Sequence, residues 1–140
     1  MASTGLDAFD STVQKTNVWL TELQEKLALE NRKSAYAALR AVLHTLRDRL
    51  PVEEAVQLGA QLPMLVRGLY YEGWTPAGKP EKTDREEFLR KVADQVVMSG
   101  PVDPERLTRG VFELLAEKVS EGEIEDVASS LPKSIRQMWP

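Results

Sequence analysis

The side chains with the greatest chemical potential in this chain are one histidine and a few carboxylates. His44 is the sole histidine, so any acid–base or metal chemistry that needs an imidazole would depend on it. Glu53 and Glu54 follow Pro51 and would lie in the first turn of a helix, where the helix dipole stabilises carboxylates. No Glu-x-x-His pattern accompanies them, so a di-iron site is not expected. Cysteine is absent, which excludes thiol catalysis, disulfides and cysteine-bound metals. We interpret His44 as a solvent-facing or interfacial structural residue and predict no catalytic residue, cofactor or metal.

Three charged residues recur at an interval of 69 positions, in the pairs Arg40/Arg109, Glu54/Glu123 and Arg67/Arg136. One interpretation is an anion or carboxylate site that is present twice. The other is structural, because the planar guanidinium group can bind carboxylates or helix-end carbonyls in several directions. We favour the structural interpretation, with Glu54 and Glu123 as the expected partners of the arginines.

An acidic segment is the first candidate for contact with a partner. Residues 113–126 hold six acids and a single base, Lys118. Such a face is often merely solvated, but it could also steer a basic partner by long-range attraction. Its candidate contact residues are Glu117, Glu121 and Glu125.

A pair of aromatic residues is the second candidate. Tyr71 and Trp74 lie just beyond the first repeated segment and have no counterpart in the second. Tyrosine and tryptophan are enriched at interface hot spots, although they also fold back over helix ends with their polar atoms wet. We predict that one of them projects from the surface and contacts a partner.

The elements that position these residues are helical. Apolar residues recur three or four positions apart almost everywhere, and no convincing strand alternation is present. Helix-start patterns begin at Thr83, Asp103 and Ser120. Together these signals predict helices near 7–29, 33–49, 52–60, 63–72, 84–98, 104–119, 121–129 and 132–138.

The chain also contains an internal repeat. Residues 19–70 align without gaps on residues 88–139, and eight of the 52 aligned positions are identical. A unit of about 50 residues buries little surface alone, so the halves should share one core. The expected fold is all-α: a duplicated bundle of about eight helices, with two pseudo-twofold-related four-helix halves in one domain, 1–140, and a connector at 71–87.

Composition excludes several classes of protein. The charged fraction is 29% and the hydrophobic fraction 42%, a balance typical of globular domains. The net charge of −4 disfavours nucleic-acid binding. A helix-turn-helix at 52–72 is a third possibility, but Arg67 alone would contact phosphate there. No membrane span or secretory leader is recognisable, so a cytoplasmic protein is expected.

The stretch from Ala38 to Pro76 carries a family resemblance. Its order is a helix, an arginine-rich turn, a proline with paired glutamates, leucine-proline, arginine-glycine and an aromatic segment ending in glycine-tryptophan. This order resembles the prokaryotic domain of unknown function 2267 family, and the resemblance extends from about Leu6 to Trp139. It implies an all-helical duplicated fold and no assigned activity.

These observations favour a small non-enzymatic interaction or regulatory module. Its partner would be another protein or a second copy of the chain, with no nucleic acid or membrane involved. The alternative is a helical protein, with or without enzymatic activity, that binds a small molecule in a groove between the halves. A deep cavity lined by Arg40, Arg67 and their repeats would favour that alternative.

Overall fold

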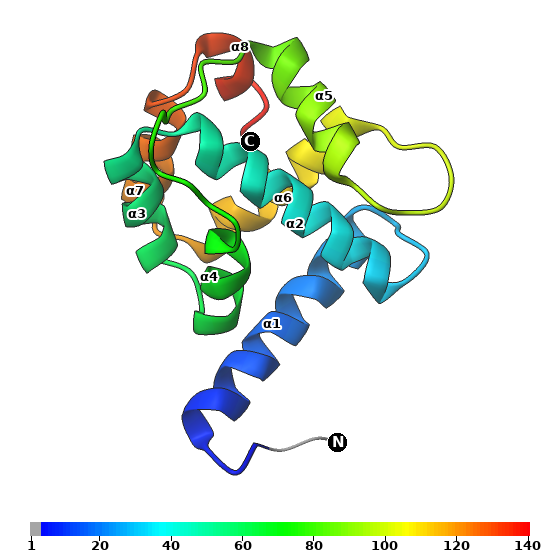
Figure 1. Cartoon of the computed structure of the whole chain (residues 1–140). Coiled ribbons are helices and arrows are strands. Elements are labelled where there is room, and N and C mark those ends of the chain that lie inside the picture. Colours follow the sequence, from blue (N-terminus) through cyan, green and yellow to red (C-terminus); the bar gives the residue numbers. More distant parts are fainter. Residues whose placement is uncertain (1–3) are drawn as a thin grey trace.

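The computed structural model describes residues 4–140, and the regular elements in that range are all α-helices. The all-helical prediction is confirmed, and the helix ends differ from the expected ones by at most three residues. The helices, shown in Figure 1, are α1 (Asp7–Lys26), α2 (Arg32–Arg49), α3 (Val52–Ala60), α4 (Met64–Tyr71), α5 (Arg85–Gln95), α6 (Pro104–Lys118), α7 (Glu121–Ser129) and α8 (Lys133–Arg136).

Side-chain caps explain where several helices begin. Asp103 accepts a hydrogen bond from the Arg106 amide at 3.2 Å, and Ser120 accepts one from the Glu123 amide at 3.4 Å, as their sequence patterns predict. The start expected at Thr83 is wrong by one residue. Asp84 is the cap of α5, because its carboxylate accepts from the Glu87 amide at 2.8 Å.

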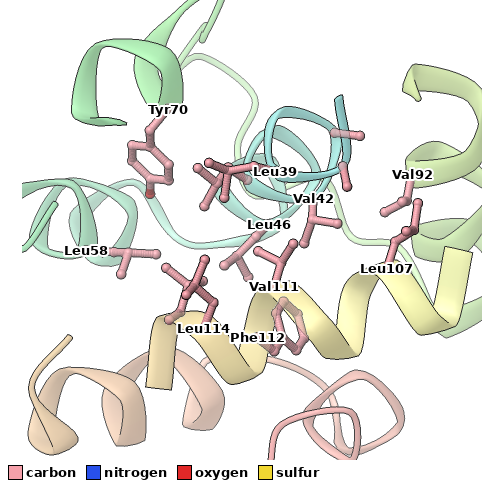
Figure 2. Packing of buried hydrophobic residues seen from close by; sticks show 14 of the residues in the cluster. Leu39, Val42, Leu46, Leu58, Tyr70, Val92, Leu107, Val111, Phe112 and Leu114 are labelled. Carbon is pink, nitrogen blue, oxygen red and sulfur yellow. The ribbon is translucent and has the colours of Figure 1, made fainter. Parts of the chain in front are cut away.

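Helices α2 and α6 form the centre of the molecule. Helix α2 contacts α1, α4, α5 and α6, while α6 contacts α1, α2, α5 and α7. Figure 2 shows Val42 and Leu46 of α2 facing Val111 of α6, all of them inaccessible to solvent. Each such side chain stabilises the fold by about 1.5–3 kcal/mol. The same apolar cluster includes residues from every helix named above.

The first half of α1 extends away from this body (Figure 1). The Thr12 hydroxyl accepts a hydrogen bond from the Leu65 amide at 2.9 Å, which joins this arm to the start of α4. Further along α1, Trp19 and Leu23 enter the core. None of the helices in residues 4–140 is long and apolar enough to cross a lipid bilayer.

Candidate functional site

An apolar groove of about 750 Å³ lies between α1, α2 and α4, and we call it the α1–α4 groove. Leu39 and Val66 are buried among its lining residues, and Glu72 is the charged residue that lines it. Contiguous exposed apolar surface of this kind often marks an interaction site. Its large exposed apolar side chains are Phe9, Val13, Tyr36, Met64 and Leu65.

The helical period positions the groove wall. Phe9, Val13 and Leu20 lie on one face of α1, because they are separated by four and seven residues. On the opposite wall, Gly68 leaves space open, since a Cβ there would meet no atom within 4 Å. This surface was not predicted from the sequence. A signal for it was present, because the apolar face of α1 continues before residue 19. Those residues lie outside the segment 19–70 that aligns with residues 88–139.

Tyr71 and Trp74 do not project from the surface as expected. Both are half-buried and pack against the core, with their ring centroids 5.5 Å apart. The Tyr71 ring lies against Gly59, where any Cβ would collide with it. Gly73 has a φ of 75°, and this left-handed turn folds Trp74 back so that its amide donates to the Tyr71 carbonyl at 3.0 Å. The pair therefore closes over the end of the core.

Replacing Trp74 with alanine should consequently destabilise the fold. The indole packs on the core and its Nε1 atom is buried. Because the side chain is only half-buried, we expect a loss of about 2 kcal/mol, less than for a fully buried tryptophan. Thermal unfolding followed by circular dichroism measures this loss. An unchanged melting temperature together with weaker partner binding would instead restore Trp74 as an interface residue.

The acidic segment, residues 113–126, has two parts: its first glutamates form ion pairs within the chain, and later ones are exposed to solvent. Glu113 and Glu117 bind the ammonium group of Lys26 at 3.0 and 2.8 Å, and these bonds raise the pKa of Lys26. They join α6 to α1. Glu121 and Glu125 are exposed on α7 and remain candidates for partner contact.

Arg67 and Arg136 make matching contacts. Each guanidinium group donates through its Nε and an Nη2 atom to carbonyl oxygens at the end of the preceding helix, and so satisfies acceptors that the helix leaves unpaired. The acceptors are the carbonyls of Gly59 and Leu62 for Arg67, at 2.9 Å each, and those of Ala128 and Leu131 for Arg136, at 3.1 and 3.0 Å.

The other repeated arginines have different partners. Arg40 pairs with Glu72 at 3.3 Å, and Arg109 donates to Glu105 at 2.9 Å and to the Gln137 carbonyl at 3.5 Å. Arg67 and Arg109 line separate surface hollows, so the four arginines do not converge on one cavity.

Glu54 and Glu123 face each other across the contact between α3 and α7, and the prediction that they bind the arginines is wrong. The Oε2 atom of each is buried and, within residues 4–140, no donor other than the facing carboxyl group is available to it. Burial, the hydrogen bond to Glu54 and the charges of Glu54 and Asp126 raise the pKa of Glu123 to about 8. At neutral pH Glu123 therefore keeps its proton beside Glu54, while the arginine groups are engaged by helix-end carbonyls and other acids.

Arg47 is an important residue that the sequence analysis missed. Its side chain is buried, and its Nη1 atom donates to the carbonyls of Tyr70 at 2.7 Å and Glu72 at 2.6 Å. Its Nε atom lies 3.1 Å from the carboxylate of Asp48. Arg47 thus satisfies carbonyls at the end of α4. In the alignment of residues 19–70 with residues 88–139, Arg47 corresponds to Ala116, so the alignment contained no signal for it.

His44 is buried where α2 meets α4, and it does not face solvent. Its Nε2 atom donates to the Leu69 carbonyl at 2.7 Å. Burial lowers the pKa of His44, so the ring is neutral at physiological pH. This arrangement agrees with the structural interpretation of the residue.

The described residues bring together no group of three or more histidine or carboxylate side chains that could hold a metal ion. A comparison with curated proteins finds no match. A family model with the description "Uncharacterized conserved protein (DUF2267)" matches residues 16–138, which confirms the resemblance noted in the sequence. The chain therefore belongs to the DUF2267 family.

Proposed function

We propose that this chain is a small non-enzymatic interaction module that binds a protein through the α1–α4 groove. The supporting observation is the gathering of Phe9, Val13, Tyr36, Met64 and Leu65, all exposed, around one hollow. A groove between two helices suits an apolar helix face, which places side chains into it at helical spacing. The net charge of −4 favours a protein partner over a nucleic acid. The cytoplasmic location stays a prediction.

We also propose that the fold is a duplicated domain with approximate twofold symmetry. In this arrangement α1, α2 and α4 of the first half correspond to α5, α6 and α8 of the second. Corresponding helices make corresponding contacts: α1 packs on α6 and α5 packs on α2, while α1 packs on α4 and α5 packs on α8. The matching carbonyl contacts of Arg67 and Arg136 support it as well. The apolar cluster that spans all these helices supports a single domain.

The groove lies where the two halves differ. Helix α5 begins at Arg85, which aligns with Thr16 in the repeat, so the turns of α1 before Thr16 have no equivalent. Those turns supply Phe9, Thr12 and Val13 to the groove. Because these turns are not required by the arrangement that the two halves share, their presence supports a binding role for the groove that they line.

A second candidate is a small apolar ligand bound in the same groove. The volume of about 750 Å³ falls within the range of roughly 300–1,000 Å³ for small-molecule sites. The ligand would lie within the first half of the chain, instead of between the halves as the sequence analysis expected.

Replacing Leu65 with glutamate tests the proposed function. A carboxylate placed in the apolar groove should weaken partner binding about tenfold or more without lowering the melting temperature, because Leu65 is exposed. Val97, 79% exposed and remote from the groove lining, is the control as Val97→Glu. Tagged variants are purified from native cells, and their bound proteins and small molecules are identified by mass spectrometry.

Retention of every bound species by Leu65→Glu would contradict the proposal. Loss of a small molecule without loss of any protein would favour the second candidate.

A further inference from the structure

We infer that the occupant of the α1–α4 groove is a second copy of this chain, docked by antiparallel packing of the two α1 helices about a twofold axis near Val13. This inference rests on the proposed function of the groove. It is carried by a surface whose exposed apolar centre lies between an acidic end and a basic end.

The exposed edge of the groove follows one face of α1. Leu6, Asp10, Val13, Asn17 and Thr21 are spaced by three or four residues and therefore share that face. Val13 is its midpoint and is 38% exposed. Asp10 and Asn17 lie on either side of Val13, separated by about 10 Å along the helix axis.

The two ends of this face carry opposite charges. The first turn of α1 contributes the carboxylates of Asp7 and Asp10, and the Asp10 carboxylate also accepts hydrogen bonds from the amide and the hydroxyl of Thr4 at 2.7 and 2.8 Å. At the other end, the guanidinium group of Arg32 binds the side chains of Asn17 and Thr21. In an antiparallel pair, the acidic end of each copy would meet the basic end of the other, and this favourable contact would form twice.

The middle of the surface does not oppose such a pairing. Glu72, the charged residue that lines the groove, is already paired with Arg40 at 3.3 Å. Phe9, Val13 and Tyr36 are exposed there and supply apolar area. A twofold contact brings the same patch of both copies together, so a patch with balanced charges fits a second copy. A strongly acidic or basic partner would complement only one end.

The test uses a pair of charge-reversed variants. Asp10→Lys makes the acidic end basic, and Arg32→Glu makes the basic end acidic, so each variant alone should dimerise at least tenfold more weakly than the wild-type chain. Mixed in equal amounts, the two should form a heterodimer. The new lysine of the first variant would then face the new glutamate of the second, and the retained Arg32 of the first would face the retained Asp10 of the second. Analytical ultracentrifugation measures the masses, and circular dichroism verifies that each variant is folded.

A matched pair of valine substitutions locates the contact on α1. Val13→Glu should abolish dimerisation, whereas Val18→Glu should not, since Val18 is 49% exposed on another face of the same helix and does not line the groove. Dimerisation that survives Val13→Glu would overturn the inference, as would single variants that dimerise normally or a mixture that stays monomeric.

The failure of this inference is distinguishable from failure of the proposed function. A wild-type chain that is monomeric at about 200 μM, well above the micromolar range of moderate affinities, would overturn self-association. Should Leu65→Glu still release another protein in that case, the groove would remain an interaction surface. If Leu65→Glu releases nothing either, both proposals fail.

Discussion

Replacing Glu123 with glutamine is expected to raise the free energy of unfolding by about 2 kcal/mol at pH 8.5. The carboxyl group of Glu123 is forced to hold a proton by burial and by Glu54, and its pKa rises from the usual 4.5 to about 8. Glutamine supplies a neutral donor of similar shape. Glu54→Gln should change stability in the same direction, because it removes the carboxylate that raises the pKa of Glu123.

The direction of this pH dependence follows from proton linkage. Below pH 4.5 the carboxyl group is protonated in both the folded and the unfolded chain, and its contribution to stability is complete. Between pH 4.5 and 8 only the unfolded chain loses the proton, so stability falls as the pH rises, and the loss is complete above 8. The full shift would correspond to about 5 kcal/mol. Partial exposure of both side chains screens it, which lowers the expected effect to about 2 kcal/mol.

Urea unfolding at several pH values between 6.5 and 9 measures the effect. Burial lowers the pKa of His44, so its protonation in the unfolded chain reduces stability as the pH falls toward 6.5 and below. This effect is confined to the acidic edge of the window and is the same in the variants. Glu125→Gln, an exposed position on the same helix, is the control and should follow the wild-type profile. Parallel profiles for the wild type and Glu123→Gln would show that the pKa of Glu123 is not raised in the folded chain.

Replacing Arg47 with methionine should lower the free energy of unfolding by about 3 kcal/mol. The substitution removes two charged hydrogen bonds and leaves the carbonyls of Tyr70 and Glu72 without their donor at the end of α4. Methionine preserves much of the apolar stem and the propensity for helix, so the effect reports on the hydrogen bonds.

Arg40 offers a matched control on the same helix. Its guanidinium group contacts the carboxylate of Glu72 in an ion pair whose members are 37% and 65% exposed. Arg40→Met should therefore change the free energy of unfolding by less than about 1 kcal/mol. Equal losses for the two variants in urea unfolding would contradict the role assigned to Arg47.

The helices could be predicted from the sequence because their signals are local. Apolar spacing identifies a buried face, and residues such as Asp103 and Ser120 mark helix starts through bonds to amides three residues away. The contacts of Arg67 with helix-end carbonyls were also within reach, since the repeat drew attention to this residue and the chemistry of guanidinium limits its partners.

The remaining features depend on how helices pack, which a single sequence does not specify. Glu54 meets Glu123 only because α3 packs on α7. From the sequence, the negative charge of both residues led to the prediction that they bind arginines. Tyr71 is half-buried because Gly59 leaves room for its ring. Arg47 aligns with Ala116, and Phe9 lies before residues 19–70, the segment that aligns with residues 88–139. That alignment therefore could not reveal either residue.

The most direct test of the central claim, that the α1–α4 groove is the binding surface, is photo-crosslinking in native cells. A benzoylphenylalanine at Phe9 changes the groove little, because the native residue is already an exposed aromatic that lines it. The same probe at Val97 and at Glu125 samples the loop after α5 and the exposed acidic face. We predict discrete protein adducts from position 9 only, with a mass of two chains if the occupant is a second copy. Adducts from position 97 or 125 without any from position 9 would contradict the claim.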